Sequence, residues 1–202
     1  MASCNFTYRK AKESDDFAAV ASLVHLTDPY IYPTVCQAPD DPFFYGLLLR
    51  CLADKTNIFA LNNLFLALDG ERPIGILCAI KCGKKATFLD NLLLTDGEKV
   101  RLAKANEGYF LPLIEESAAF EGHNVTNLCV DPAFRGKGVG EGLLRFYLES
   151  VKGDTVHLDV IAANGGAVRL YQRCGFVLDK EYNGFSGTDE PLLCYHMIRK
   201  GQ

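Results

Sequence analysis

The six residues at 135–140, Arg-Gly-Lys-Gly-Val-Gly, constrain the fold of this chain more than any other segment. They follow a short apolar run at 125–130 and precede a stretch at 141–152 whose apolar residues recur at helical spacing. A glycine-rich loop that leads into a helix lets the backbone approach a ligand and presents N–H groups at the positive end of the helix dipole. The segment therefore predicts a strand, an anion-binding loop and a helix, with a plain flexible turn as the alternative.

Two common phosphate-binding motifs do not fit this loop. A P-loop requires Gly-x-x-x-x-Gly-Lys-Ser/Thr, whereas Lys137 is followed by a glycine and no glycine stands at 131. The dinucleotide fingerprint Gly-x-Gly-x-x-Gly places Glu141 or Leu143 where its third glycine should be. Asp159 follows the loop at the ~20-residue distance expected of a ribose-binding acid. The glycine spacing therefore argues against a nicotinamide dinucleotide as the ligand but does not exclude it.

The rest of the chain predicts strands with interspersed helices. Alternating or continuous apolar runs predict strands, and apolar residues three and four apart predict helices. The expected strands are 5–9, two within 64–80 joined by a hairpin turn at 69–73, 125–130, 155–161, 175–182 and 192–200. The expected helices are 13–26, 40–54, 109–121, 141–152 and 165–174, with Pro42 and Pro112 suited to first turns. This order predicts a single α/β domain of 202 residues.

Composition and charge narrow the classes of function. The content of 49% hydrophobic and 23% charged residues is that of a folded protein. A net charge of −4 argues against a nucleic-acid platform, which usually carries a basic face, and mildly favours a cationic substrate. The amino terminus lacks an apolar signal segment, and no run approaches the ~18 apolar residues of a membrane span. We therefore expect a cytoplasmic protein that acts away from membranes.

The cysteines and histidines predict no metal site. The eight cysteines include no Cys-x-x-Cys pair, and the four histidines show no ligand spacing. Several cysteines, such as Cys78 and Cys129, lie within apolar runs, where a thiol packs as a small hydrophobic side chain. We expect buried, reduced thiols and no bound metal.

Two segments together resemble the GCN5-related N-acetyltransferase (GNAT) family. Residues 127–144 are similar to its acyl-CoA-binding segment, in which a strand is followed by Arg/Gln-x-x-Gly-x-Gly/Ala and a helix. A second segment is similar to the family's Leu-x-Val…Asn…Ala…Leu-Tyr-x-x-x-Gly-Phe, filled here by Leu158, Val160, Asn164, Ala167, Leu170, Tyr171, Gly175 and Phe176. The resemblance implies an α/β fold with a central, mostly antiparallel sheet that splays open at the CoA site and is flanked by helices.

The chain departs from the family pattern between its third and fourth strands. The family usually joins these strands tightly, whereas residues 83–124 separate them here. We expect one GNAT domain over 1–202, with this insertion serving as a substrate lid, a dimerisation element or decoration.

The resemblance implies an acetyl-CoA site. The loop backbone would hold the pyrophosphate, and the preceding strand would pair with the pantetheine arm, so that the N–H of Val130 could stabilise a developing oxyanion. Asn164 would hydrogen-bond the pantetheine arm or orient its loop, although an asparagine before two glycines is also a good cap residue. The implied cofactor-binding residues are Leu128, Cys129, Val130, Arg135, Gly136, Lys137, Gly138, Val139, Gly140, Asn164 and Tyr171.

Catalysis would need an acid and a base. Attack on a thioester expels a thiolate, and the family often uses the tyrosine of its Leu-Tyr pair, here Tyr171, as the general acid. A protonated amine, with a pKa near ~10.4, must also lose a proton. The candidate bases are Asp159 on the 155–161 strand, Glu121 or His123 before the 125–130 strand, and a water-relayed group elsewhere.

The predicted function is transfer of an acetyl group from acetyl-CoA to a primary amine of a small molecule or a peptide N-terminus. The alternative is a catalytically silent acyl-CoA-binding or regulatory domain. The sequence leaves the acceptor and the general base open, because the first helices and the insertion contain no readable motif. If the protein forms an oligomer, a homodimer is expected.

Overall fold

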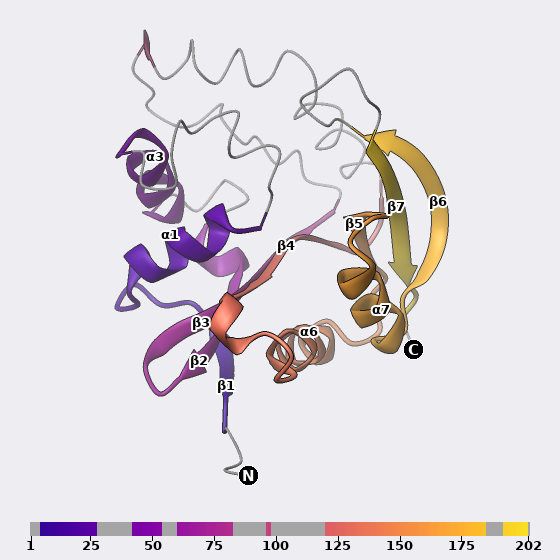
Figure 1. The fold of residues 1–202 in the computed structure, drawn as a ribbon, viewed down its shortest axis with the longest axis horizontal. Helices are drawn as coiled ribbons and strands as arrows, with labels where there is room; N and C mark the ends of the chain where they lie inside the picture. Colours follow the sequence, from indigo (N-terminus) through magenta and orange to yellow (C-terminus); the bar gives the residue numbers. More distant parts are fainter. Residues whose placement is uncertain are drawn as a thin grey trace.

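The structure, a computed structural model, describes residues 5–27, 42–53, 60–82, 96–97, 120–184 and 192–201. Its strands form a seven-stranded sheet in the order β1-β2-β3-β4-β5-β7-β6 (Figure 1). β4 and β5 are parallel, and the other neighbouring pairs are antiparallel. The strands are β1 (Thr7–Lys10), β2 (Leu64–Asp69), β3 (Arg72–Lys81), β4 (His123–Val130), β5 (Val156–Ile161), β6 (Val177–Gly184) and β7 (Leu192–Arg199). The mixed, mostly antiparallel sheet predicted from the sequence is confirmed.

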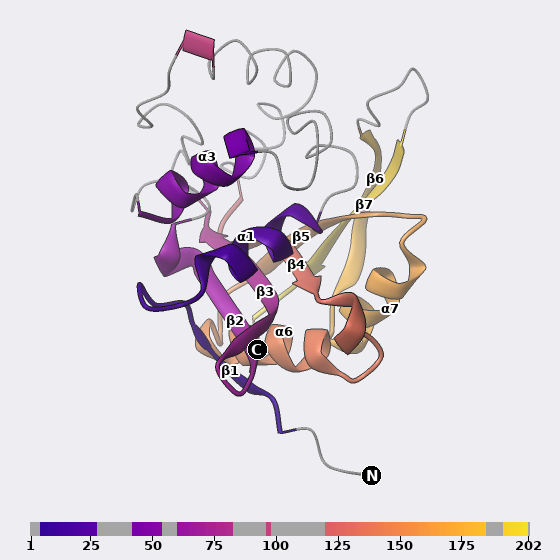
Figure 2. The same ribbon diagram turned by 60° about the vertical axis from the view of Figure 1, so that its left-hand side comes forward.

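Helices cover both faces of this sheet. Figures 1 and 2 show α1 and α3 on one face, called here the α1 face, and α6 and α7 on the other, called the α6 face. The helices are α1 (Phe17–His25), α3 (Pro42–Ala53), α6 (Val139–Ser150) and α7 (Gly165–Arg173), with short 3-10 helices η1 (Leu61–Asn63) and η2 (Pro132–Phe134). The two faces bury separate cores, so the central strands are apolar on both sides.

Alternation along β2 shows how one strand supplies both cores. Leu64, Leu66 and Leu68 pack with α1 and α3, whereas Phe65 and Ala67 pack with α6. Successive side chains of a strand point to opposite faces, and this period of two explains why the segment reads as a continuous apolar run.

Most predicted elements have the expected type, with ends shifted by a few residues. The hairpin turn between β2 and β3 is confirmed, with Gly70 at φ +61°. β4 begins at His123, before the expected start at 125, and α6 begins at Val139 rather than at 141. The predicted helix at 109–121, the cap before Pro42 and most of the insertion at 83–124 lie outside the described residues.

The cysteines of the described segments are buried, as expected. Burial raises the pKa of the Cys78 thiol to about 12, so this group stays protonated near neutral pH. Cys4 and Cys36 lie outside the described residues.

The sheet opens between its two parallel strands. β4 pairs with β5 over His123–Val125 and Val156–Leu158, and the pairing ends there. On the opposite edge of β4, which pairs with β3, Asn127 faces Cys78 and Val125 faces Ala79. Thr126 is therefore an extra residue in a β-bulge. A bulge bends its strand and increases the local twist. The bulge therefore stands at the point where β4 diverges from β5.

Candidate functional site

A cavity of about 600 Å³ lies where β4 and β5 diverge. It is bounded by the end of α1, the end of β4, the glycine loop, the start of α6 and α7. Its lining residues are Leu26, Thr27, Leu128, Cys129, Val130, Phe134, Arg135, Gly136, Gly138, Val139, Gly140, Glu141, Asn164, Gly166, Ala167, Leu170, Tyr171 and Arg173. All the residues that the sequence assigned to the cofactor line this cavity except Lys137. Segments far apart in the chain thus meet in a single site.

The cavity reaches both faces of the sheet. Tyr171 and Val139 belong to the core of the α6 face, whereas Cys129 belongs to the core of the α1 face. Leu26 and Thr27, at the end of α1, complete the wall on the α1 face. Two reactants could therefore approach a common point from opposite faces.

The end of β4 directs backbone N–H groups toward this gap. The N–H of Asp131 donates to the carbonyl of Ile74 at 2.8 Å, on the β3 side. N–H groups alternate between the two edges of a strand, so those of Val130 and Leu128 point to the opposite edge, toward β5. Within the described segments no strand pairs with that edge beyond Val125. The edge can therefore bind an extended ligand that carries amide groups.

The glycine loop makes an anion cradle at the start of α6. Gly136 and Gly138 have φ values of +75° and +81°, in the left-handed region that favours glycine. Gly142 N–H donates to the carbonyl of Gly138 at 2.9 Å, so the N–H groups before it have no intrahelical partner. A β-carbon at Gly140 would lie 3.4 Å from Val130 Cγ2 and would narrow the cavity. These features suit a bound pyrophosphate.

The side chains of the loop hold its shape. Asp131 accepts hydrogen bonds from Ala133 N–H at 2.9 Å and from Arg72 Nη2 at 2.7 Å. Arg135 Nε donates to the carbonyl of Val130 at 3.1 Å. The ammonium of Lys137 lies 4.8 Å from the ring centroid of Phe134, a residue of the cavity wall, and the predicted contact of Lys137 with the cofactor stays a prediction.

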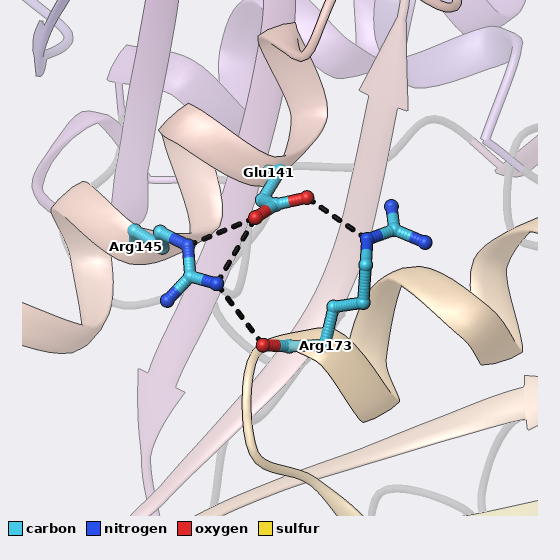
Figure 3. Close-up of polar contacts among 3 residues, drawn as sticks. All are labelled: Glu141, Arg145 and Arg173. Carbon is cyan, nitrogen blue, oxygen red and sulfur yellow. Dashed lines mark hydrogen bonds and ion pairs between the residues drawn. The ribbon is translucent and has the colours of Figure 1, made fainter.

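An ion-pair cluster joins the start of α6 to the end of α7 (Figure 3). Glu141 accepts from Arg145 Nε at 3.1 Å and Nη2 at 3.0 Å, and from Arg173 Nε at 3.0 Å. Hydrogen bonds from Arg173 and Arg145 hold the pKa of Glu141 below its usual value. Two guanidinium groups face one carboxylate, so the cluster adds positive charge beside the cavity that Glu141 and Arg173 line.

Tyr171 is a buried phenol on the cavity wall. Its side chain belongs to α7, and its residue is 8% exposed. Burial raises its pKa to about 12, so the hydroxyl is protonated and can donate a proton. In the same helix Asn164 is the N-cap: its Oδ1 accepts from Ala167 N–H at 3.1 Å while the residue also lines the cavity. Asn164 is therefore the cap that the sequence allowed, and its contact with the pantetheine arm stays a prediction.

The three candidate bases lie in different surroundings. His123 is the first residue of β4, where β4 is still paired with β5, and its Nε2 lies 3.1 Å from Asp154 Oδ2. Glu121 is exposed, and its backbone carbonyl is 3.1 Å from His157 Nε2. Asp159 points to the α1 face, because its neighbours Leu158 and Val160 belong to the α6-face core.

Sequence reasoning missed two parts of this region. Thr27 Oγ1 accepts from Asn127 Nδ2 at 2.8 Å and so fixes the end of α1 against β4, although 100 positions separate the two residues. Asp159 Oδ1 is 3.0 Å from His196 Nδ1, a pairing set by the place of β7 beside β5. Neither contact has a local sequence signal.

The part of the chain that the structure describes holds no cluster of three His, Cys, Asp or Glu side chains suited to a metal ion. Its helices are all too short or too polar to cross a bilayer.

A sequence model of the acetyltransferase (GNAT) family matches residues 32–176. The chain belongs to the GNAT family. This confirms the family expected from the paired motifs at 127–144 and 158–176.

Relatives of this GNAT protein include an N-alpha-acetyltransferase, RimI, of Mycobacterium tuberculosis, 39% identical over 70 residues, which are 33% of this chain and 44% of that protein. The chain spans less than half the length of the curated relatives it matches. Among solved structures, an N-acetyltransferase from Staphylococcus aureus Mu50 has a TM-score of 0.64 at 17% identity, over 95% of this chain and 99% of that one. Arabidopsis thaliana NAA60 in complex with acetyl-CoA has a TM-score of 0.55 at 20% identity, over 97% and 98% of the two chains. These likenesses show that the fold is shared.

Proposed function

We propose that this GNAT protein is an acetyl-CoA-dependent N-acetyltransferase that acetylates a primary amine of a small molecule or a peptide N-terminus by direct transfer. The observation that carries the proposal is the cavity between β4 and β5, which joins an anion cradle to a buried phenol and opens to both faces of the sheet. The relative RimI, named as an N-alpha-acetyltransferase, and the acetyl-CoA complex of NAA60 support it.

The residues of the cavity fit the chemistry of CoA. The N–H groups at the start of α6 would hold the pyrophosphate, and Arg173 would add positive charge beside it. The edge of β4 at Leu128–Val130 would pair with the pantetheine amides, and the amide group of Asn164 would contact the same arm.

When bound, acetyl-CoA supplies a thioester carbonyl as the electrophile and a thiolate as the leaving group. The N–H of Val130 points to the gap and would stabilise negative charge on the carbonyl oxygen. Tyr171 would give its proton to the departing sulfur, because its raised pKa of about 12 keeps the phenol protonated at neutral pH.

The acceptor amine would approach from the α1 face. Most of the cofactor residues lie on the α6 face or at the edge of β4, so the wall formed by Leu26 and Thr27 on the α1 face is left for the second substrate. A net charge of −4 suits a cationic amine. We further infer one catalytic domain, because both cores share a single sheet.

Two measurements test this proposal. Calorimetry should detect acetyl-CoA binding at micromolar concentration, and a screen of amines with acetyl-CoA should release free thiol with at least one acceptor. Absence of binding would refute the central claim. Binding without thiol release across small amines, polyamines, amino acids and peptides would favour the silent acyl-CoA-binding alternative.

A further inference from the structure

A continuous hydrogen-bonded chain crosses the α1 face of β5 and β7. Asp159 Oδ1 is 3.0 Å from His196 Nδ1, His196 Nε2 is 3.2 Å from His157 Nδ1, and His157 Nε2 is 3.1 Å from the carbonyl oxygen of Glu121. Asp159 and His196 are direct partners across the two strands, and His157 lies on the same face of β5 as Asp159. Each imidazole nitrogen faces its neighbour rather than a common point, so the cluster has the arrangement of a hydrogen-bonded chain and not that of a metal site.

Phe120 covers this chain and keeps it out of water. Its ring stacks on His157 at 4.7 Å and on His196 at 4.9 Å between centroids. The residues His157 and His196 are 6% and 2% exposed. The buried imidazole nitrogens are satisfied by each other, by the Asp159 carboxylate and by the Glu121 carbonyl, as buried polar atoms generally are.

The number of hydrogen bonds in this chain depends on how many protons it holds. A carboxylate at one end and a backbone carbonyl at the other can only accept, so three hydrogen bonds require three protons. Two neutral imidazoles supply two, and the third must be an additional proton held by the chain. Without that proton, one contact joins two lone pairs, so the two-proton form of the chain is the form that can accept a proton and act as a base.

Geometry favours His196 as the holder of the additional proton, because its Nδ1 faces the Asp159 carboxylate, whereas His157 Nε2 faces a backbone carbonyl. Burial, the main cause, lowers the pKa of His157, and the positive charge of His196 acts in the same direction. The hydrogen bond to Glu121 and the carboxylates of Asp179 and Asp159 act in the opposite direction and are outweighed. Lys180 lies 5.9 Å from the centroid of the Phe120 ring and adds positive charge above the stack.

One member of the chain is accessible. The side chain of Asp159 is 25% exposed, whereas that of His196 is 3% exposed. Asp159 also lies on the sheet face where Thr27 and Leu26 line the cavity, opposite the face that holds Tyr171. A proton from a ligand on the α1 face would therefore enter the chain at Asp159.

We propose that Asp159, His196 and His157 act together as the base of the acetyl transfer, with Asp159 receiving the proton of the acceptor ammonium and His196 storing it. This inference rests on the proposed function. Asp159 is the catalytic residue, and His196 and His157 are positioning residues that set its proton affinity and orientation.

The proton balance closes without another reactant. The first N–H bond of the ammonium breaks, its electron pair stays on nitrogen, and the proton passes through Asp159 to His196. That pair forms the C–N bond as the C–S bond breaks, and the sulfur takes the proton of Tyr171. The second nitrogen proton restores the Tyr171 hydroxyl, and His196 returns the stored proton to water.

The test compares pH profiles of kcat for an acceptor found in the thiol-release screen. In the wild type, kcat should rise through one ionisation between about pH 5 and 8, where imidazoles titrate. His196→Asn should lower the plateau by about 10-fold or more, within the range for general base catalysis, and move the acidic limb by at least about one pH unit. The affinity for acetyl-CoA should not change. An acidic limb that stays in place in His196→Asn would overturn the proposal, whatever the loss of rate.

A second measurement does not depend on activity. Nitrogen NMR of histidine in the full chain should show a buried imidazole with both nitrogens protonated at low pH. Asp159→Asn should move the midpoint of that titration to lower pH by about one unit, the scale of one lost close charge partner. The control, Asp179→Asn, removes an exposed carboxylate that is not a member of the hydrogen-bonded chain formed by Asp159, His196 and His157. This control should move the titration midpoint far less. Equal effects of the two variants would refute the relay, and they would do so even if no acceptor is ever found.

Discussion

Gly142 of α6 lies directly against the phenol of Tyr8 in β1, so closely that a β-carbon at position 142 would overlap the hydroxyl and its ring carbon. This contact lets the helix lie low on the α6 face, where Tyr8 also stacks on Phe146 at 6.3 Å. The position of α6 fixes the anion cradle at its start.

Gly142→Ala should therefore destabilise the fold. We expect a loss of about 1–3 kcal/mol, the usual cost of overpacking, measured as a lower urea midpoint at unchanged slope. In a Tyr8→Ala background the same substitution should cost much less, because the overlapping ring is gone. Equal costs in both backgrounds would show that the contact does not limit the helix position.

Gly138→Ala should weaken both the fold and cofactor binding. The left-handed backbone at φ +81° costs a residue with a β-carbon about 1–2 kcal/mol, although nothing lies within 4 Å of that carbon. We expect the Kd for acetyl-CoA to rise about 10-fold, equivalent to about 1.4 kcal/mol. The matched control is Gly153→Ala, which also has positive φ and open space but lies outside the cavity. It should lose stability while keeping its affinity; a similar loss of affinity in both variants would contradict the cradle.

Tyr171→Phe should slow the reaction without weakening acetyl-CoA binding. Loss of the proton donor should lower kcat by about 100-fold, at the low end for general acid catalysis. The phenol, with a pKa of about 12, should cause no alkaline decline in kcat below about pH 11. Tyr147→Phe serves as the control, because its buried hydroxyl has no hydrogen-bond partner among the described residues and lies outside the cavity. A kcat unchanged in Tyr171→Phe would remove this residue from the mechanism.

The ion pair between Arg9 of β1 and Asp15, in the turn between β1 and α1, should make the free energy of unfolding depend on pH. Hydrogen bonds from Arg9 hold the pKa of Asp15 below its usual value, and the carboxylate also accepts from Lys12 N–H at 2.6 Å. Because the folded pKa lies below the unfolded one, this stabilisation is present above about pH 4 and is lost as pH falls through the folded value.

Asp15→Asn should thus cost about 1–3 kcal/mol at pH 7, typical of hydrogen bonds to charged groups, and progressively less below about pH 4. Urea unfolding at several pH values measures it. Asp16→Asn is the neighbouring control: Asp16 caps α1 by accepting from Ala18 N–H at 3.0 Å, and asparagine caps about as well. A pH-independent cost for Asp15→Asn would contradict the ionic contribution.

The local parts of the site could be predicted from the sequence, and the parts built by strand order could not. Gly136, Gly138 and Gly140 lie within five consecutive residues of the loop and the start of α6, so their spacing alone predicted the cradle and the helix that follows it. Asp159 was named as a candidate base, but its partner His196 lies 37 positions away on a strand that inserts between β5 and β6. Local periodicity does not specify which strands become neighbours.

The β-bulge at Thr126 also depends on strand pairing and so could not be predicted from the local sequence. Thr126 is an ordinary strand residue in the sequence, and its status as an extra residue depends on the register of β3 against β4. The end of α1 likewise joined the cavity through Asn127, a contact between distant segments.

That extra residue has an evolutionary consequence. Deleting one codon at 126 would let β4 resume regular pairing with β3, and nothing in the register would then force it away from β5. Such a protein could keep both cores and the anion cradle. Its strands β4 and β5 would stay paired, and the gap that joins the two faces of the sheet would be closed. If the protein transfers acetyl groups as proposed, deletion of this one residue should abolish the transfer while the fold is retained.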